Sequence, residues 1–218
     1  MIDKFVPTLA AALADILDGS TVLAAGFGPG MPATLMRGLA EQGARDLTLV
    51  MNAGGRDDGP IADLLATGHV RKLICSFVRA DSVAGRLFAA GRLELEIVPQ
   101  GTLAERIRAA GAGVQAFFTP TAADTILAKG RETRTINGRP CLLEYPIFAD
   151  VALIDAWQAD RFGNLTHRDS ARNYNPIMAM AAKLTIAQTA HVVELGAIEP
   201  EHVHTAGVFV QRVLHVPL

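Results

Sequence analysis

Residues 26–30, which read Gly-Phe-Gly-Pro-Gly, are the clearest chemical signal in the sequence. The apolar run at residues 21–25 predicts a buried strand before them, and Pro32 suits the first position of a following helix. A strand that enters a helix through glycines exposes backbone N–H groups, and these groups can hold an anion such as a phosphate. A tight turn between strand and helix without any ligand explains the pattern equally well.

This glycine loop differs from a dinucleotide-binding fingerprint at two points. Met31 occupies the place of the third glycine. Asn52 ends the next predicted strand, where an NAD site needs an acidic residue for the ribose. We therefore do not predict a nicotinamide cofactor.

Metal and thiol chemistry have weaker support than anion binding. His202 and His204 could supply two metal ligands, but a hydrogen-bonded or exposed pair is the better interpretation, so no metal site is predicted. Cys75 lies in an apolar stretch, which favours a buried and unreactive thiol. Cys75 and Cys141 form no Cys-x-x-Cys motif, so neither a disulfide framework nor a zinc ribbon is expected.

The composition excludes several classes of partner. The 218 residues include 20 Lys plus Arg and 22 Asp plus Glu, and the net charge of -2 offers no basic surface for DNA or RNA. Hydrophobic residues make up 50% of the chain, which is enough for a sizeable core. We find no signal-like N-terminal segment and no uninterrupted apolar run of membrane-spanning length. We expect a soluble, cytoplasmic protein with neither a nucleic-acid nor a membrane partner.

Alternating strands and helices position these residues in the first half of the chain. The expected strands are residues 21–25, 47–51, 72–77 and 93–98, and the expected helices are residues 9–17, 32–42, 60–66, 83–90 and 103–110. Thr102 is predicted to cap the last of these helices. Short connections rich in glycine and proline favour an α/β fold, with an open, largely parallel sheet and helices on both faces.

The second half of the chain is predicted to be richer in strands. The expected strands are residues 115–119, 141–144, 151–155, 184–189 and 192–195. One helix interrupts them, with Asn175 as its N-cap and Pro176 in its first turn. Residues 131–138 are polar and turn-rich, which indicates an exposed hairpin or loop. Because no linker, repeat or low-complexity segment divides the chain, we expect one domain over residues 1–218.

Seven sequence blocks together resemble the A (alpha) subunit of the family I CoA transferases. They are residues 18–27 and 30–32 around the glycine loop, and then 99–106, 118–121, 163–166, 171–176 and 204–210. They include Pro99-Gln100-Gly101-Thr102 and Ala171-Arg172-Asn173-Tyr174-Asn175-Pro176. The blocks follow the family's order and span nearly the whole chain, so together they are far more specific than any one of them.

The resemblance implies an enzyme that moves CoA from succinyl-CoA to a 3-oxoacid, with 3-oxoadipate as the expected acceptor. In the family, a glutamate of the B subunit, or of the second half of a fused chain, forms a glutamyl-CoA thioester. None of the nine glutamates of this chain lies in the Glu-Asn-Gly setting of that nucleophile. The resemblance therefore implies a heteromer with a CoA-transferase B subunit, in which a CoA thioester is the substrate and no cofactor is bound permanently.

Gln100 and the glycine loop are the first site residues that the resemblance implies. A carboxylate that attacks a thioester creates an oxyanion, and Gln100, on the loop after a predicted strand, resembles the family glutamine whose amide stabilises that charge. The segment expected to approach CoA or the acyl group consists of Ala24, Ala25, Gly26, Phe27, Gly28, Pro29 and Gly30. Ala25 stands in place of the family's first glycine and the loop is one residue shorter than the signature, which leaves the substrate preference open.

Asn52 and Arg79 are implied to bind substrate. Asn52 resembles one of two adjacent asparagines in relatives, although Met51 replaces the other. Arg79 resembles an arginine of the oxoadipate-type relatives, where acetoacetate-type relatives tend to have a glycine. A guanidinium can pair with the distal carboxylate of 3-oxoadipate through two hydrogen bonds. An arginine solvated at the end of the strand is an equally good interpretation.

Other functions stay open on the sequence alone. The acceptor could be acetoacetate or another short 3-oxoacid. A sugar-phosphate isomerase or hydrolase of similar architecture would need its own acid/base pair, and no His/Asp arrangement indicates one. A non-catalytic CoA-binding module would keep the glycine loop, but the presence of Gln100 argues against it.

Overall fold

The computed structural model describes residues 2–217, and its main body is a nine-stranded sheet. The strand order is β1-β12-β11-β9-β2-β3-β4-β5, and β10 pairs with β9 outside this path. Neighbouring strands of the path are parallel, whereas β10 is antiparallel to β9. The strands are β1 (Phe5–Val6), β2 (Thr21–Ala24), β3 (Leu47–Val50), β4 (Val70–Cys75), β5 (Glu94–Ile97), β9 (Ala149–Ala159), β10 (Leu165–Thr166), β11 (Ala182–Val192) and β12 (Arg212–His215).

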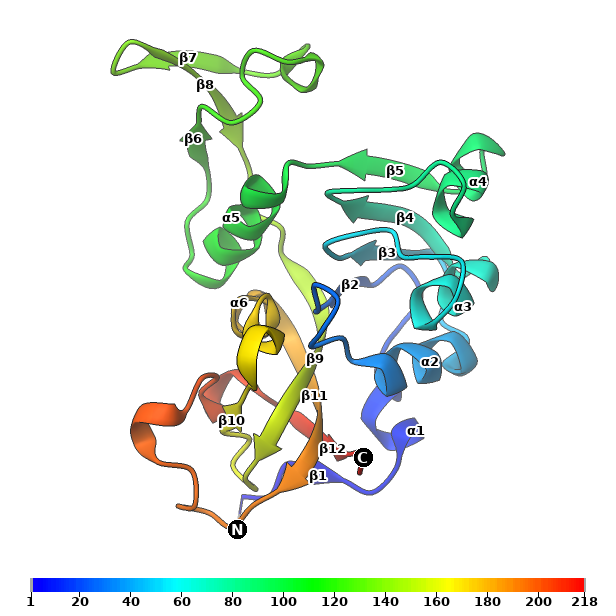
Figure 1. Cartoon of the computed structure of the whole chain (residues 1–218), viewed down its shortest axis with the longest axis vertical. Coiled ribbons are helices and arrows are strands. Elements are labelled where there is room, and N and C mark those ends of the chain that lie inside the picture. The colour runs from blue at the N-terminus through cyan, green and yellow to red at the C-terminus, as the bar shows by residue number, and fades with distance from the viewer. Residues whose placement is uncertain (1, 218) are drawn as a thin grey trace.

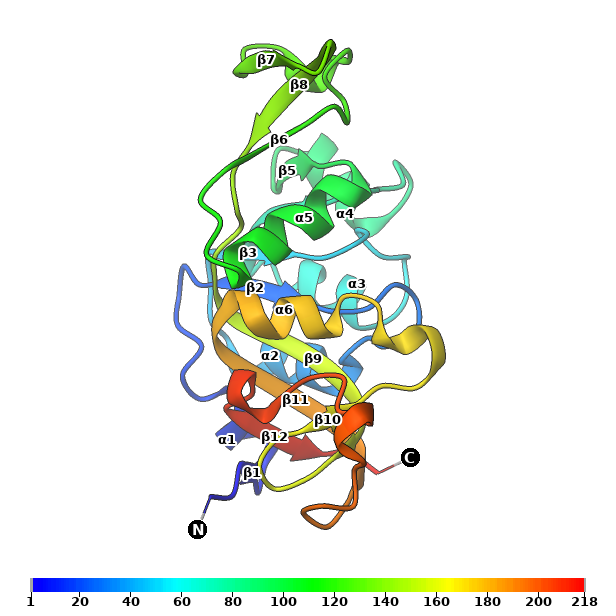
Figure 2. The same ribbon diagram turned by 90° about the vertical axis from the view of Figure 1, so that its left-hand side faces the viewer.

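Helices cover both faces of this sheet (Figure 1, Figure 2). On one face lie α1 (Leu9–Leu13), α2 (Ala33–Gln42), α3 (Pro60–Ala66) and α4 (Val83–Ala89). On the other face lie α5 (Gln100–Gly111) and α6 (Asn175–Ala181). The predicted open, largely parallel sheet with helices on both faces is confirmed. Within residues 2–217, none of the helices has the length and apolar character needed to cross a membrane.

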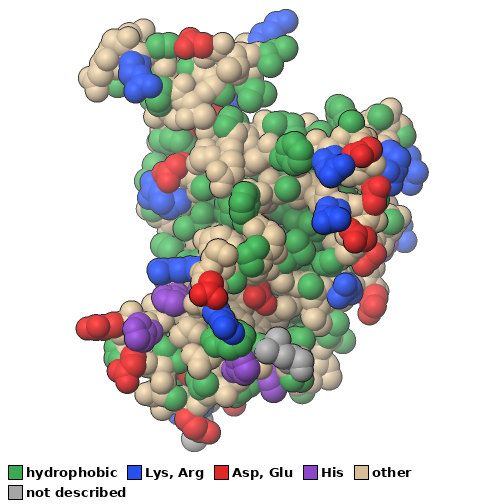
Figure 3. All heavy atoms as spheres, viewed as in Figure 1, with side chains coloured by type: hydrophobic (Ala, Val, Ile, Leu, Met, Phe, Trp, Pro, Cys, Tyr) green, Lys and Arg blue, Asp and Glu red, His purple; other side chains and the backbone are tan. Residues whose placement is uncertain are grey.

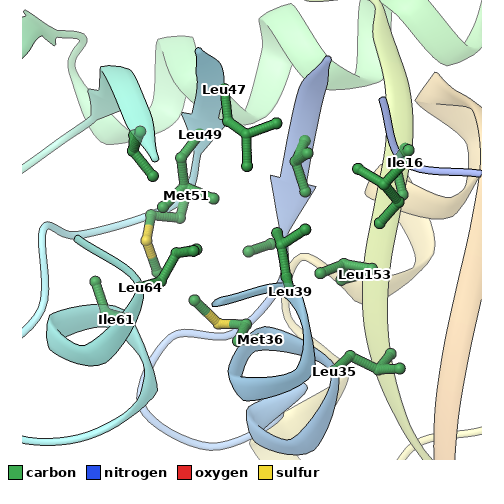
Figure 4. Close-up of a cluster of buried hydrophobic side chains, with 14 of the residues drawn as sticks. Ile16, Leu35, Met36, Leu39, Leu47, Leu49, Met51, Ile61, Leu64 and Leu153 are labelled. Carbon is green, nitrogen blue, oxygen red and sulfur yellow. The ribbon is translucent and has the colours of Figure 1, made fainter. Parts of the chain in front are cut away.

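Strand β2 shows how the sheet is buried on both sides. Val22 and Ala24 belong to the apolar cluster under α1–α4, whereas Leu23 belongs to the cluster on the α5 and α6 face. Because successive side chains of a strand point to opposite faces, a strand buried on both faces reads as a continuous apolar run. Figure 4 shows the first cluster, in which Leu39 of α2 faces side chains of β3 such as Leu49.

A small antiparallel sheet projects beyond α5 (Figure 1), and it forms the upper lobe of the space-filling view (Figure 3). Its strands are β6 (Phe117–Thr119), β7 (Thr133–Ile136) and β8 (Arg139–Glu144), in the order β6-β8-β7. The turn between β7 and β8 consists of Asn137 with φ 50° and Gly138 with φ 74°, and a type I′ hairpin turn requires positive φ at both positions. The exposed hairpin expected within residues 131–138 is therefore present.

Short 3₁₀ helices complete the described chain. They are η1 (Ile126–Ala128), η2 (Asp169–Arg172), η3 (Pro200–His202) and η4 (Gly207–Phe209).

Helix α5 begins three residues earlier than the sequence predicts. Its first residue is Gln100 and Pro99 is its N-cap, so the placement of Gln100 on a loop is wrong. Thr102, the expected cap, is instead buried inside the first turn. Pro99, with φ −52° and ψ 138°, is the extended residue that precedes the helix, so Thr102 falls inside the first turn and cannot act as the N-cap.

Other boundaries also differ from the sequence-based expectation. Asn175 is the first residue of α6, and Tyr174 precedes it as the N-cap. Residues 184–189 and 192–195 do not form two strands, because β11 continues without a break to Val192. Strands β9 and β11 are longer than predicted, since they pair with each other from Ala149 and Ala182 onward along almost their whole length. Helix α1 ends at Leu13. Residues 14–15 form a turn, and residues 16–17 have no regular secondary structure.

Candidate active site

The carboxyl ends of β2, β3, β4 and β5 lie along one edge of the sheet, and the predicted site segments follow them. The glycine loop follows β2, Asn52 follows β3, Arg79 lies beyond β4, and Gln100 comes after β5. Open parallel sheets bind ligands at this edge, at the point where the strand order reverses. Here the order reverses between β2 and β9, so the glycine loop borders that point.

Tyr174 brings Asn52 and Gln100 together at this edge. The Tyr174 hydroxyl lies 3.3 Å from Oδ1 of Asn52 and 3.4 Å from the carbonyl oxygen of Gln100, and it can donate to either oxygen. Asn52 and Tyr174 are buried, whereas the Gln100 side chain is exposed. Burial raises the pKa of Tyr174, and a hydrogen bond with Gln100 acts in the opposite direction. The phenol therefore stays protonated and serves as a donor.

The glycine loop needs its glycines for conformation and for space. Gly26 has φ +111° and Gly30 has φ +74°, values that side chains other than glycine rarely adopt. A Cβ at Gly26 would lie 2.9 Å from the Cα of Met31. A Cβ at Gly30 would collide with the carbonyl oxygen of Ala171 and would lie 2.9 Å from Nδ2 of Asn175. The loop therefore packs tightly against residues 171–175.

Two asparagines from that segment hold the loop, and the sequence did not reveal their role. Asn173 Nδ2 donates to the Pro29 carbonyl oxygen at 3.0 Å, and Asn175 Nδ2 donates to the Gly30 carbonyl oxygen at 3.1 Å. Asn175 is fully buried. The resemblance included residues 171–176 as a block, and the structure shows that the block contributes anchors for a loop far away in the chain.

Asp155 and His167 are titratable groups in a second hollow, next to Ala171 and Gln188. They line a hollow of about 280 Å³ together with Trp157, Ala171 and Gln188. Burial raises the pKa of Asp155 to about 6. Burial lowers the pKa of His167 to about 4, so its imidazole is neutral at neutral pH. His167 Nδ1 lies 2.9 Å from the Asp155 carbonyl oxygen and therefore carries the proton, which leaves Nε2 to accept from Thr205 Oγ1.

Arg79 lines a hollow whose lining includes neither Asn52 nor Gln100. Its guanidinium pairs with Asp81, with Nε 3.2 Å from Oδ1, and its side chain is 58% exposed. It lines a charged hollow of about 320 Å³ with Arg56, Asp57 and Asp58. Among the described residues, Arg79 makes no hydrogen bond with Asn52, Gln100 or Tyr174. The structure therefore brings Asn52 and Gln100 together but does not bring Arg79 to them.

The other residues that drew attention in the sequence show no sign of catalytic chemistry. Burial raises the pKa of the Cys75 thiol to about 11, which keeps it protonated and unreactive. His204 Nδ1 accepts from the backbone N–H of His167 at 2.9 Å, and His202 is exposed. Over residues 2–217 there is no group of three or more His, Cys, Asp or Glu side chains that could hold a metal ion.

A family model described as "Coenzyme A transferase" matches residues 6–215. The chain belongs to this family. Its relatives include the A subunit of the 3-oxoadipate CoA-transferase of Pseudomonas putida, which is 55% identical over 99% of this chain and 95% of the relative. The A subunit of the probable succinyl-CoA:3-ketoacid coenzyme A transferase of Bacillus subtilis is 48% identical over 91% of this chain and 84% of the relative. The resemblance found in the sequence is confirmed.

Solved structures of CoA transferases share the fold of this family member. An acyl-CoA transferase from E. coli O157:H7, solved as a thioester complex with CoA, matches 99% of this chain and 47% of the longer chain, with a TM-score of 0.88 and 22% identity. The glutaconate coenzyme A-transferase of Acidaminococcus fermentans matches 98% of this chain and 76% of its own, with a TM-score of 0.85 and 20% identity. At these identities the likeness concerns the fold alone.

Within residues 2–217 of this CoA-transferase chain, no glutamate side chain is hydrogen-bonded to Asn52, Gln100 or Tyr174. One group of glutamates forms ion pairs with arginine or lysine, and this group is Glu94, Glu96, Glu105, Glu132 and Glu144. The others, Glu41, Glu194, Glu199 and Glu201, are exposed and make no side-chain hydrogen bond with Asn52, Gln100 or Tyr174. None of the described glutamates is therefore part of the hydrogen-bonded group formed by Asn52, Gln100 and Tyr174.

Proposed function

We propose that this chain is the A subunit of a two-subunit enzyme that transfers CoA from succinyl-CoA to a 3-oxoacid, with 3-oxoadipate as the acceptor. The relatives from Pseudomonas putida and Bacillus subtilis support this role and this reaction, because they bear these names and align over nearly the whole chain. The observation that carries the proposal is the convergence of Asn52 and Gln100 on Tyr174, in a hydrogen-bonded group that includes none of the described glutamates.

The nucleophile in this proposal is a glutamate of the B subunit. Its carboxylate attacks the thioester carbonyl carbon of succinyl-CoA, and the carbonyl oxygen becomes an oxyanion. The side-chain amide of Gln100 donates a hydrogen bond to this oxygen. Because Gln100 opens the 12-residue helix α5, the backbone N–H groups of the first turn add partial positive charge at the same place. The C–S bond then breaks, which leaves a mixed anhydride of succinate and the glutamate and releases the CoA thiolate. The thiolate attacks the glutamyl carbonyl carbon of the anhydride, so that succinate leaves and the glutamyl-CoA thioester forms. The same donors serve when the carboxylate of the 3-oxoacid attacks this thioester and displaces the thiolate, which then attacks the 3-oxoacyl carbonyl carbon and frees the glutamate.

The glycine loop is the proposed contact for the CoA thioester. A Cβ built at Gly28 would meet no atom within 4 Å, which means that space is open beside the loop backbone. The Phe27 side chain is 53% exposed and lies next to that space in the chain. A ligand can therefore approach the exposed residues 27–29 closely, which supports the role proposed for this part of the loop, whereas Ala24, Ala25 and Gly26 are buried behind it. Tyr174 has the supporting role of holding Asn52 and the first residue of α5.

Arg79 is the proposed contact for the distal carboxylate of 3-oxoadipate. Its exposed guanidinium already binds a carboxylate, that of Asp81, and a substrate carboxylate would replace this partner. Acetoacetate or another short 3-oxoacid is the second candidate acceptor. The relative named for 3-ketoacids favours it, as does the lining of the Arg79 hollow, which includes neither Asn52 nor Gln100.

The substrate itself supplies the CoA group in this reaction, so the proposal includes no permanently bound cofactor. The proposal also places the enzyme in the cytoplasm. Cys75 and Cys141 are both free thiols, which supports a reducing compartment.

The test is to assemble the chain with the B subunit of a CoA transferase and to measure transfer of CoA from succinyl-CoA to 3-oxoadipate and to acetoacetate. We expect turnover only in the assembled enzyme, with 3-oxoadipate as the better acceptor. Mass spectrometry after borohydride or hydroxylamine trapping should place the glutamyl-CoA adduct on the partner B subunit. An adduct on this chain, or turnover by this chain alone, would contradict the proposed division of labour.

A further inference from the structure

Asp155 in β9 connects to both ends of the segment that runs from the glycine loop into α2. Its backbone N–H donates to Oδ1 of Asn175 at 2.8 Å, and Asn175 Nδ2 donates to the Gly30 carbonyl oxygen at 3.1 Å. Its side-chain Oδ1 accepts from Nε2 of Gln188 at 2.9 Å. Asp155 is therefore linked to the loop through Asn175 and to α2 through Gln188.

Gln188 in β11 supplies the cap that α2 lacks locally. Pro32 is the N-cap of α2 and makes no side-chain hydrogen bond to the helix. Gln188 Oε1 accepts from the backbone N–H of Thr34 at 3.1 Å and of Leu35 at 3.2 Å. The first N–H groups of a helix have no partner within the helix, so a buried helix start needs such an acceptor. Gln188 is only 9% exposed, which removes water as the alternative partner.

The two contacts of Gln188 fix the orientation of its amide. The N–H groups of Thr34 and Leu35 require the carbonyl oxygen on the α2 side, so the NH₂ group must point toward Asp155. Gln188 and Asp155 are also partners in the register of β9 and β11, which places them next to each other on one face of the sheet. The Asp155 carboxylate therefore holds the Gln188 amide in the orientation that caps α2.

We propose that Asp155 and Gln188 are positioning residues, which hold the glycine loop and the start of α2 in the conformation that binds the CoA thioester. This inference rests on the proposed function of the loop, residues 24–30. Asp155 anchors the loop at Gly30 through Asn175, and it anchors Thr34 and Leu35 through Gln188. Neither residue touches Asn52, Gln100 or Tyr174 through a hydrogen bond among the described residues, so both act on substrate through the loop.

Exchanging the two functional groups between the partners tests the contact. Gln188→Glu keeps an acceptor for α2 but sets a second carboxylate against Asp155. KM is measured from pH 7 to pH 9, because two neighbouring carboxylates repel each other only at a pH that ionises both. Adding Asp155→Asn places an amide in β9, where it can donate a hydrogen bond to the new carboxylate at position 188 in β11. In the assembled enzyme we expect Gln188→Glu to raise KM for succinyl-CoA at least tenfold and the double variant to return it to within about threefold of the wild type. Absence of this rescue would overturn the proposal.

Amide hydrogen exchange gives a readout that does not depend on catalysis. In the full chain, Gln188→Ala should speed exchange at the N–H groups of Thr34 and Leu35 at least tenfold, because both lose their acceptor. Gln115→Ala is the matched control, since this exposed glutamine bonds only the Gly113 carbonyl oxygen, and it should change neither exchange nor KM. Unchanged exchange in Gln188→Ala would refute the inference even in an active enzyme. If Gln188→Ala shows the faster amide exchange but the assembled wild-type enzyme transfers no CoA, the proposed function is refuted and the contact of Gln188 with α2 stands.

Discussion

The Tyr174 hydroxyl lies 3.3 Å from Oδ1 of Asn52, and this contact joins the start of α6 to the end of β3. The same hydroxyl is 3.4 Å from the Gln100 carbonyl oxygen. Because Tyr174 and Asn52 are buried, the contact is shielded from water and its geometry is well defined. The exposed amide of Gln100, the proposed oxyanion donor, is therefore attached to a rigid part of the chain, as that role requires.

Removing that amide should slow the assembled enzyme without unfolding it. Loss of one donor from an oxyanion hole costs about 2.7 to 4 kcal/mol of transition-state stabilisation, so Gln100→Ala should lower kcat about 10²- to 10³-fold. The side chain is exposed, so the thermal midpoint should move little. Steady-state kinetics and thermal denaturation of the assembled enzyme check both expectations. A loss in kcat below about threefold, roughly 0.6 kcal/mol, would make Gln100 a structural residue.

Comparing Gly30→Ala with Gly28→Ala separates the cost of backbone strain from the cost of a steric clash in the glycine loop. Both positions have positive φ, which costs an alanine about 1 to 2 kcal/mol. Only the Cβ at Gly30 would strike Ala171 and Asn175, so that variant should lose about 2 to 5 kcal/mol of unfolding free energy in total. Urea denaturation of the two variants measures the difference. Equal losses in both would show that residues 171–175 do not pack against the loop in solution.

Arg79→Ala tests the choice of acceptor. Hydrogen bonds to a charged group contribute about 1.5 to 3 kcal/mol, so KM for 3-oxoadipate should rise at least about tenfold. KM for acetoacetate, which lacks the distal carboxylate, should stay within about twofold. Arg56→Ala is the matched control, because Arg56 lines the same hollow and pairs with Asp58. Equal effects on the two acids, or none on either, would remove Arg79 from the substrate site.

Asp155 and His167 should have opposite effects on stability across nearly the same pH range. The raised pKa of Asp155, about 6, means that its contribution to stability falls as pH rises from about 4 to about 6. The lowered pKa of His167, about 4, means that its contribution is lost as pH falls from about 6.5 to about 4. Each effect is on the order of 1 to 3 kcal/mol. In the wild type, the two contributions to the free energy of unfolding therefore change in opposite directions between about pH 4 and about pH 6.

Asp155→Asn should therefore reveal the His167 contribution. We expect the unfolding free energy of this variant to rise steadily from about pH 4 to about pH 6.5 and to exceed that of the wild type at about pH 7. Denaturant titrations of both proteins at several pH values make the comparison. A variant whose stability runs parallel to that of the wild type over this range would show that the Asp155 carboxylate is not destabilised by burial.

Local patterns in the sequence predicted the glycine loop, and they could not predict what holds it. A strand, glycines and a helix within residues 21–42 form a local signal, and the structure contains all three. The anchors Asn173, Asn175 and Gln188 lie 144, 145 and 154 residues away from the positions they contact, so no local spacing indicates them.

The errors in the sequence-based prediction have the same origin. Thr102 has the right chemistry for a helix cap, but Pro99 starts the helix before it. Asn175 also has the chemistry of a cap, and its side chain instead joins Asp155 to Gly30. In both cases a local preference was overridden by the path of the chain between elements. The approach of Asn52 and Gln100 to Tyr174 depends on three separate elements. Only the resemblance to a family placed Asn52 and Gln100 in one site, and it gave Tyr174 no role there.

The large separation between the glycine loop and its anchors has a consequence for the order of folding. Contacts between distant parts of a chain form late, because the entropy of closing a long segment must be overcome first. During synthesis the N-terminal units emerge first, and a nascent chain that ends before residue 171 contains none of the three anchors. The loop therefore reaches its final conformation only after α6 and β11 have docked. The loop therefore becomes able to bind a ligand only at the end of folding, even though it is among the first segments to be synthesised.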